Sequence, residues 1–360
     1  MVRYLPFVLL AGACLPAMGQ DVLLVPDSSS DRVWAFSASD GSLVDDSFIV
    51  DPGSDDGVDV FDRPLEVLVG TTGQLYVCDQ FADVVSEFGS DGSFVGVFSL
   101  GGVRDGDIMN NIRGGHVLTS GSGAGDVLVT NSGAFNDLAV SQKNVKRLNP
   151  GDGAEKEDFA FNRYGGIRGP FDVIEYNGEV LVADEGQDKI VRYTMDGKFN
   201  ERFTSALAVP LLDFPQQMAA TADGNLLVCA FSTGYILEFD STGALVGQFQ
   251  AGLELFRGVC ELDSGNLMVT TTTGVFEVTR AGDFVRTIAS GDGFRYITRF
   301  TPPAGLLRVG DEPALTGTRT DSMDEQNEQI EKPAVDQRSK AEIIADERGM
   351  VSQRSTEVTR

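Results

Sequence analysis

Histidine is almost missing from this chain, because His116 is the only one in 360 residues. A histidine-ligated zinc centre is therefore nearly excluded, and a Ser-His-Asp hydrolase would depend on His116 without a Gly-x-Ser-x-Gly turn to support it. Lysine is scarce as well, and the formal net charge is −26. Nucleic acids and anionic membrane surfaces need clustered positive charge on their partners, so we expect neither of them to bind.

Long apolar runs are missing beyond the N-terminus, so we expect no membrane span. At the N-terminus, Arg3 precedes the mostly apolar residues 4–13, and Ala17-Met18-Gly19 offers the small residues that a signal peptidase reads. We therefore expect a signal peptide over residues 1–19, cleaved near Gly19-Gln20. The mature protein would be secreted, periplasmic or part of the cell envelope. A lipoprotein anchored at Cys14 is the alternative, but no large aliphatic residue stands three positions before that cysteine.

Cysteines are few, and Cys14 would leave with the signal peptide. The three that remain, Cys78, Cys229 and Cys260, each lie in an apolar strand context. We interpret them as small buried hydrophobic residues. A Cys229–Cys260 bridge is the open alternative in an oxidising compartment. No cysteine spacing is typical of a metal site.

A repeat recurs along the chain at roughly 40–45 residues. Each copy has an apolar strand that ends in a small or polar residue, then a turn, a second strand, an Asp-Gly-like turn and a third strand. The first strands of the six copies are Leu23–Asp27, Leu75–Asp79, Val127–Asn131, Val180–Asp184, Leu226–Ala230 and Leu267–Thr271. All-β repeats of this length are typical of four-stranded propeller blades.

A further strand precedes these copies, as in Pro64–Val69 and Pro170–Ile174. The first copy has no such strand, and a matching one appears at the other end of the repeat region, as Phe294–Phe300. Pairing of this last inner strand with the N-terminal blade would hide two sheet edges that invite aggregation. The sequence therefore predicts an all-β fold, a closed six-bladed β-propeller over residues 20–301.

The segment Leu181–Tyr193, which reads Leu-Val-Ala-Asp-Glu-Gly-Gln-Asp-Lys-Ile-Val-Arg-Tyr, resembles the NHL repeat. Gly73–Val77 and Gly224–Val228 match the turn and strand that precede this pattern. The chain thus resembles the NHL-repeat and SMP-30-like six-bladed propellers over about residues 21–301. That group includes enzymes, sensors and interaction modules, so the resemblance implies a fold rather than one activity.

Residues 302–360 differ from the repeats, since they contain no Phe, Tyr, Trp or Cys and carry 12 acidic and 8 basic residues. Such a segment cannot bury enough apolar surface to fold alone. We expect a flexible polar tail, with a short helix around Ala341–Arg348 as one possible element.

Arginines recur near the starts of five of the six inner strands. They are Arg63, Arg113, Arg168, Arg257 and Arg295. In a propeller these starts and the ends of the second strands lie around the same channel face, the usual ligand site. Five guanidinium groups could hold a carboxylate or another small anion through paired N–H donors.

The competing interpretation is structural. Arg63 precedes Asp79 by 16 positions and Arg168 precedes Asp184 by the same number, so each arginine could pair with the aspartate of its own blade. Arg113 and Arg257 face Asn131 and Thr271 instead. They are therefore the better candidates for ligand binding.

A metal site is a second hypothesis. In SMP-30-like lactonases a Glu, an Asn and an Asp at the channel mouth hold a divalent metal, and Glu66, Asn131 and Asp172 could imitate that set. The chain lacks the family's Glu-Gly-Pro entry, however. Aspartates also crowd the loop at residues 51–62 and could bind Ca²⁺, although the spacing fits no EF-hand and a solvated acidic loop is favoured.

Taken together, the sequence favours an exported, monomeric, non-catalytic propeller that binds a partner protein or a small anionic ligand at its channel face. No cofactor is expected, with Ca²⁺ or another divalent cation as the exception. A metal-dependent lactonase or hydrolase is the first alternative, and a structural or adhesive surface protein is the second.

Overall fold

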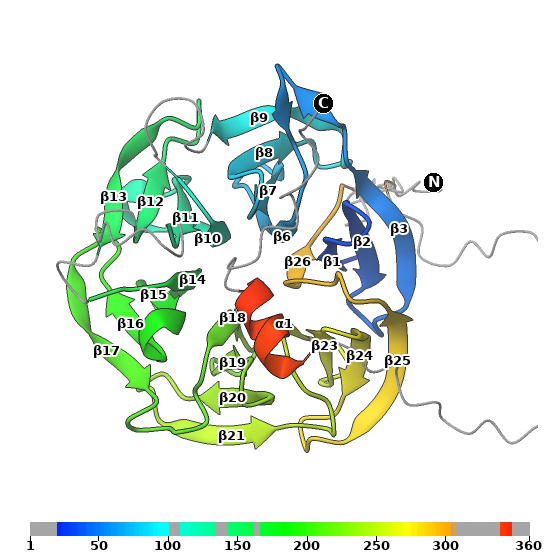
Figure 1. Ribbon diagram of the computed structural model, residues 1–360, viewed down its shortest axis with the longest axis vertical. Coiled ribbons are helices and arrows are strands. Elements are labelled where there is room, and N and C mark those ends of the chain that lie inside the picture. Colours follow the sequence, from blue (N-terminus) through cyan, green and yellow to red (C-terminus); the bar gives the residue numbers. More distant parts are fainter. Residues whose placement is uncertain are drawn as a thin grey trace, which may run out of the picture.

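The computed structural model describes residues 20–100, 109–133, 143–161, 166–303, 306 and 339–347. Six antiparallel sheets of four strands each are arranged radially around a central axis, as Figure 1 shows. The fold is therefore a six-bladed β-propeller, as the sequence predicted. The proposed signal peptide and most of the polar tail lie outside the described residues.

The blades follow one another along the chain, and each runs from an inner strand at the channel to an outer strand at the rim. The first three blades are β26 (Thr298–Phe300), β1 (Val22–Asp27), β2 (Arg32–Ser37) and β3 (Leu43–Val50); β6 (Pro64–Val69), β7 (Leu75–Asp79), β8 (Val84–Phe88) and β9 (Phe94–Leu100); and β10 (Ile112–Val117), β11 (Val127–Asn131), β12 (Asn144–Leu148) and β13 (Glu155–Phe161).

The remaining three blades repeat the same order. They are β14 (Pro170–Tyr176), β15 (Glu179–Asp184), β16 (Lys189–Tyr193) and β17 (Phe199–Ser205); β18 (Pro215–Ala220), β19 (Leu226–Ala230), β20 (Tyr235–Phe239) and β21 (Leu245–Phe249); and β22 (Gly258–Glu261), β23 (Leu267–Thr271), β24 (Gly274–Val278) and β25 (Phe284–Ser290). The short hairpin β4 (Ser54–Asp55) and β5 (Val58–Asp59) lies in the acidic loop, and two 3-10 turns span Gly121–Gly123 and Glu185–Gln187.

The ring is closed by the two ends of the propeller segment. β26 pairs antiparallel with β1, with Leu24 opposite Thr298 and Val22 opposite Phe300, and a bridge joins Asp27 to Phe294. The closing strand predicted from the repeat phase is therefore confirmed. Because β26 covers the inner edge of β1, that edge is not left open.

The hydrophobic core lies between neighbouring blades. Strands buried on both faces read as continuous apolar runs, because each sheet packs against a sheet on either side. One core cluster joins Val22 and Leu24 of the first blade to Val67, Val77 and Phe88 of the second. Similar clusters fill the seams between the other blades.

Glycines in the turn before the outer strand fasten one blade to the next. Gly243, at φ +87°, packs against the carbonyl group of Phe203 in the outer strand of the preceding blade. Gly92, Gly153 and Gly197 meet Phe48, Phe98 and Phe159 in the same way. An added Cβ at any of these glycines would overlap a backbone oxygen.

We expect Gly243→Ala to destabilise the propeller more than Gly224→Ala does. The two glycines have nearly the same φ, +87° and +86°, but a Cβ at Gly224 would meet no atom within 4 Å. The strain of a left-handed alanine is thus common to both variants, and the backbone clash adds about 1–3 kcal/mol to Gly243→Ala alone. Equilibrium unfolding in urea would measure the difference, and equal losses of stability would show that this contact does not matter.

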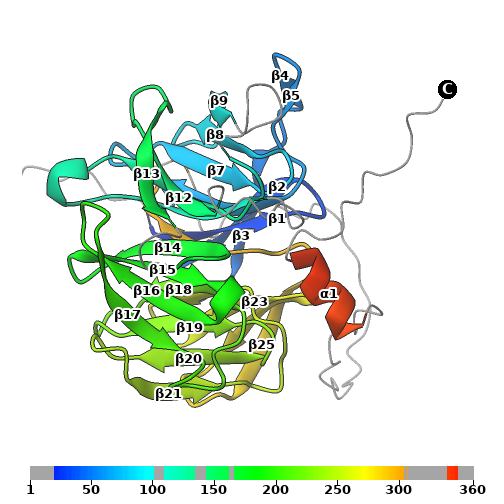
Figure 2. The ribbon, with the colours of Figure 1, turned by 60° about the vertical axis from the view of Figure 1, so that its left-hand side comes forward.

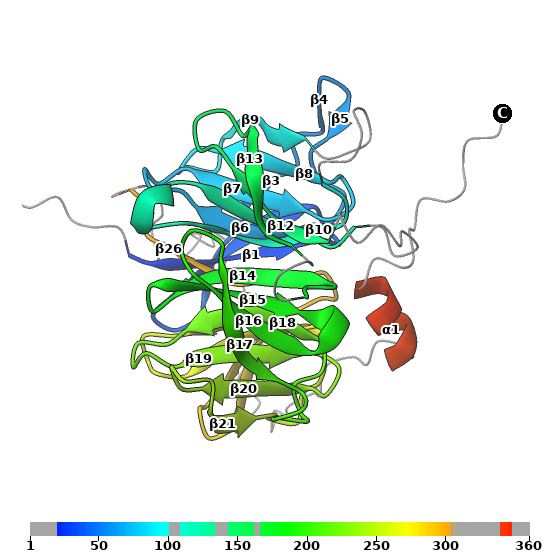
Figure 3. The same cartoon turned by 90° about the vertical axis from the view of Figure 1, so that its left-hand side faces the viewer.

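Outside the sheets, one helix is described. α1 (Lys340–Glu347) lies against one face of the ring, as Figures 2 and 3 show from two sides. Its position agrees with the short helix predicted near residues 341–348. None of the helices in the described ranges is long and apolar enough to cross a membrane.

Candidate functional site

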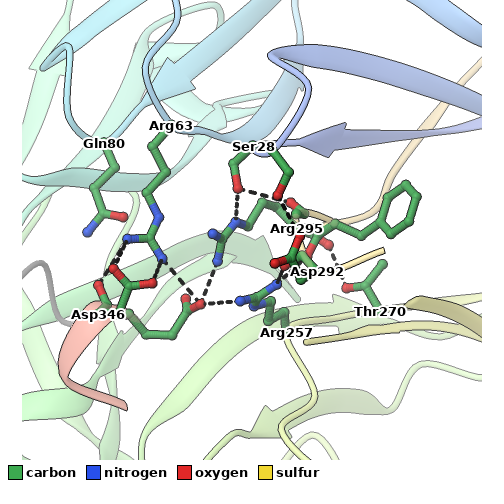
Figure 4. A network of polar contacts seen from close by, with 12 residues as sticks. Ser28, Arg63, Gln80, Arg257, Thr270, Asp292, Arg295 and Asp346 are labelled. Carbon is green, nitrogen blue, oxygen red and sulfur yellow. Dashed lines mark hydrogen bonds and ion pairs between the residues drawn. The ribbon is translucent and has the colours of Figure 1, made fainter. Parts of the chain in front are cut away.

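Three of the five predicted arginines converge at the channel face under α1. Arg63, Arg257 and Arg295 precede β6, β22 and β26, so they come from three different blades, and Figure 4 shows their guanidinium groups pointing toward one another. We call this place the arginine mouth. A recess of about 340 Å³ adjoins it and is lined by these arginines with Ser28, Ser29, Asp62, Phe81, Asp292 and Asp346.

A single carboxylate oxygen accepts hydrogen bonds from all three arginines. Oε1 of Glu347, at the end of α1, accepts hydrogen bonds from Nη2 of Arg257 at 2.6 Å, Nη1 of Arg295 at 2.5 Å and Nη2 of Arg63 at 3.3 Å. The Glu347 residue is 2% exposed. Charge-assisted bonds of this kind are about twice as strong as neutral ones, so the mouth holds a carboxylate firmly.

Arg63 has a different set of contacts from the other two arginines. Its Nη1 donates to Oδ1 and to the backbone oxygen of Asp346, both at 3.0 Å, and its Nη2 reaches Oδ2 of Asp346. The guanidinium also lies 4.9 Å from the centre of the Phe81 ring. The side-chain hydrogen bonds of Arg63 thus connect the second blade to α1.

Arg257 and Arg295 are also anchored within the ring. Nη1 of Arg257 donates to the backbone oxygens of Asp292 and Phe294, and Nε of Arg295 donates to Oγ of Ser28. The segment that carries β26 therefore both closes the ring and positions two cationic groups at the mouth.

The pKa values at the mouth reflect crowding of like charges. Burial, with repulsion from Arg257 and Arg63, lowers the pKa of Arg295 to about 9, so this guanidinium is still protonated at neutral pH. Burial alone would raise the pKa of Glu347, but attraction to Arg257, Arg295 and Arg63 lowers it well below its usual range. The crowded cations are thus stabilised by an anion between them.

The other two predicted arginines do not join this cluster. Arg113 is buried over the Phe171 ring, 4.2 Å from its centre, and pairs with Glu185 at 3.6 Å. Arg168 is exposed. Of the two preferred ligand candidates, Arg257 therefore belongs to the cluster. Arg113 does not, and it pairs with a carboxylate of the neighbouring blade.

The aspartates that end the second strands do not pair with the guanidinium groups of their own blades. The Asp79 carboxylate accepts backbone N–H groups of residues 62, 63, 81 and 82, and Asp184 accepts those of Arg168 and Gly169. The 16-residue spacing thus reflects a turn that the aspartate holds together. The structural interpretation of the arginines as ion pairs within a blade is wrong for Arg63, whose guanidinium reaches Asp346 and Glu347.

Glu66, Asn131 and Asp172, the hypothesised metal ligands, each have hydrogen-bond partners within the ring. Oε2 of Glu66 accepts the N–H of Gly115, and the two oxygens of Asp172 accept the N–H groups of Val173 and Met218. The amide of Asn131 instead bonds Asn110 and Asn144. The bonded oxygens thus accept backbone N–H groups, one of them from the strand of Asp172 itself. No group of three or more His, Cys, Asp and Glu side chains suited to a metal ion occurs in the described ranges.

Glu66 and Asp172 each link the inner strands of two neighbouring blades. Glu66 of β6 accepts a hydrogen bond from β10, and Asp172 of β14 accepts one from β18. A Cβ added at Gly114 would lie 2.8 Å from Oδ1 of Asp172. Burial raises the pKa of Asp172 to about 7, and burial together with Asp172 raises the pKa of Glu66 well above its usual value. The two buried carboxyl groups therefore disfavour each other's ionisation.

These two acids predict a pH dependence of stability. Since their pKa values are higher in the folded chain than in the unfolded chain, folding binds protons, and the free energy of unfolding falls as the pH rises from about 4 to 7. We expect Glu66→Gln, which keeps an oxygen for Gly115, to flatten this fall. Thermal melts at pH 5 and 7.5 would show it as a smaller difference in Tm.

Glu175→Gln is the control for this effect. Ser120 and Thr119 lower the pKa of Glu175 against the raising effect of its partial burial, so its contribution to stability is lost as the pH falls rather than as it rises. This variant should leave the decline above pH 5 in place. An unchanged slope in Glu66→Gln would show that Glu66 is already ionised in the folded chain.

The remaining sequence predictions concern cysteines and the acidic loop. Cys78 and Cys229 are buried, Cys260 is partly buried, and all three are free thiols, as expected for small hydrophobic residues. In the acidic loop, Oδ1 of Asp51 accepts the N–H of Gly53 and Oδ2 of Asp55 accepts that of Val97.

Comparisons with known proteins support the fold. A propeller from the nidogen/laminin complex aligns with a TM-score of 0.59 and 13% identity, over 79% of this chain and 100% of that one. A protein of unknown function from Bacteroides caccae aligns at 0.55 and 12%, over 78% and 99%. A gluconolactonase from Xanthomonas campestris aligns at 0.52 and 17%, over 80% and 91%.

At these identities the similarity concerns the fold alone, and it places the chain among six-bladed propeller-like structures. No protein-family model matches the sequence, and no curated protein does either. Membership of the NHL-repeat group therefore stays a prediction.

The site residues missed by sequence reasoning are Asp346 and Glu347. They are separated from the propeller by a segment with no aromatic residues, and nothing in that segment points to the channel. The one available indication was two acidic residues at the end of a possible helix. Acidic side chains are unfavourable there because the C-terminal end of a helix is partially negative.

Proposed function

We propose that this chain is a non-catalytic binding propeller that acts at the cell envelope or outside the cell and recognises carboxylate groups at the arginine mouth. The observation that carries the proposal is the convergence of Arg63, Arg257 and Arg295 on one carboxylate oxygen. The N-terminal apolar segment with its small-residue cleavage pattern supports export.

The electrostatics of the mouth support an anionic ligand in a protein that is otherwise strongly acidic. When α1 is away, three arginines face Asp62 and Asp292 among the residues that line the recess. Oδ1 of Asp292 accepts the hydroxyl of Ser29. The mouth then has more positive than negative charge, so a ligand carboxylate would take the place of Glu347.

Citrate binding to an opened variant tests the proposal. Ile343→Ser combined with Glu347→Ser removes the apolar anchor of α1 and the carboxylate that all three arginines share, without changing any residue of the six sheets. We expect isothermal titration calorimetry to detect citrate binding to this variant that weakens as salt is raised. Triethyl citrate, which lacks the charges, should not bind. Equal binding of both compounds, or of neither, would contradict the proposed function.

A further inference from the structure

The helix α1 occupies the arginine mouth by two kinds of contact. Ile343, 3% exposed, packs with Phe171, Phe214, Phe231, Leu255 and Tyr296, which form an aromatic and apolar seat. Asp346 and Glu347 follow at positions i+3 and i+4, so they lie on the same face of the helix as Ile343. The helix therefore presents one apolar anchor and two carboxylates to the ring.

The N-terminal end of α1 carries its own cap. Oε2 of Glu342 accepts the N–H and the hydroxyl of Ser339, and the N–H of Glu342 donates to Oγ of Ser339. This reciprocal pattern is a capping box. The segment thus encodes a helix start at Ser339.

The C-terminal end of α1 is different, because its residues oppose helix formation. The last turn carries no basic residue and ends in Asp346 and Glu347, which the negative end of the helix dipole disfavours. Nη1 of Arg63 compensates by donating to both the backbone oxygen and the carboxylate of Asp346. The composition of this turn is therefore explained by the arginine mouth rather than by the helix itself.

One polar group in the seat under the helix lacks a hydrogen bond. The hydroxyl of Tyr296, a residue 1% exposed, has no hydrogen-bond partner among the described residues while Ile343 packs near it. An eight-residue helix is marginal in water by itself, so α1 depends on the seat. α1 therefore has the features of a segment that fills the mouth and can be replaced there by another helix.

Building on the proposed function, we infer that the partner of the mouth is a protein helix with an apolar side chain followed one turn later by Asp-Glu, and that α1 is its built-in competitor. Because α1 belongs to the same chain, it binds intramolecularly, and a partner must displace it. The mouth would thus be closed at rest and opened by an acidic helix that binds the same groups.

A peptide with the sequence of residues 339–347, acetylated, amidated and fluorescently labelled, tests this inference. We expect fluorescence anisotropy to show at least tenfold tighter binding to the opened variant (Ile343→Ser, Glu347→Ser) than to the unmodified full chain. Peptides carrying Ile343→Ser or Glu347→Gln should each bind the opened variant at least tenfold more weakly. If the double substitution impairs folding, the Glu347→Ser chain serves in the same comparison.

A scrambled peptide of the same composition is the control. The inference is overturned if this peptide binds as tightly as the ordered sequence, or if the unmodified chain binds the peptide as well as the opened variant does. Citrate binding without peptide binding would also overturn it and leave the proposed function standing. Binding of neither probe would contradict the proposed function as well.

Discussion

Arg63→Met should release α1 from the ring while all six sheets stay intact. The side-chain hydrogen bonds of Arg63 go to Asp346 and Glu347, both in α1. Loss of one partner from a buried ion pair costs about 3–5 kcal/mol. Because Arg257 and Arg295 remain to hold Glu347, we expect a cost at the lower end of that range. This cost still raises the fraction of molecules with α1 released from the ring (the released fraction) at least tenfold.

Trypsin cleavage after Lys340 would measure this release. Lys340 is exposed but lies in the first turn of the helix, so cleavage requires the helix to unfold, and its rate follows the released fraction. Arg192→Met is the matched control, because Arg192 also stacks on a phenylalanine ring, 5.0 Å from the centre of Phe203, and has acidic partners. A tenfold faster cleavage in both variants would show a general loss of stability rather than release of α1.

Removal of the closing strand should have the largest effect of any change considered. A chain that ends at residue 293 loses Phe294, Tyr296, Ile297 and Phe300, each no more than 3% exposed. At about 1.5–3 kcal/mol for each buried side chain, the loss is about 6–12 kcal/mol, which equals the whole stability of a typical domain. We therefore expect an unfolded or aggregated protein, also because the edge of β1 is exposed.

The control for this truncation is a chain that ends at residue 303. It keeps β26 and all six complete blades and lacks α1. Circular dichroism melts should show cooperative unfolding of this chain within a few degrees of the full chain. If the chain ending at residue 293 also melted cooperatively near that temperature, the ring closure described here would not be needed for stability.

The fold could be predicted from the sequence because each part of it leaves a local pattern. The strand-turn repeat marked the blades. The sequence also predicted the last residue of one strand in every blade, namely β1, β7, β11, β15, β19 and β23. The missing inner strand of the first copy required a strand near residues 294–300. These inferences depend on period and phase, which the sequence contains directly.

The candidate site was predicted only in part, since its contacts cross blades. Arg63, Arg257 and Arg295 followed from their repeated place before the inner strands. Their partners did not follow, because Asp79 is used by backbone N–H groups and the carboxylate that is bound stands far along the chain at Glu347. A contact between a ring and a distant helix leaves no periodic trace in the sequence.

The same limit applies to Glu66 and Asp172. Their positions one or two residues into the inner strands suggested a place in the channel lining, and the structure shows both side chains buried and bonded to neighbouring inner strands. Whether such carboxylates bind a cation or bridge backbone donors depends on where the neighbouring N–H groups lie. Gly114 and Gly115 of β10 leave room for both carboxylates to approach that strand.

The most direct test of the central claim is hydrogen exchange of the α1 amides in the unmodified full chain, followed by mass spectrometry. Since an isolated helix of this length is unstable in water, protection of residues 343–347 requires that Glu347 is seated among the three arginines. The account predicts slow exchange that becomes fast in Arg63→Met and stays slow in Arg192→Met. Exchange of these amides at the rate of an unstructured chain, already in the unmodified protein, would contradict it.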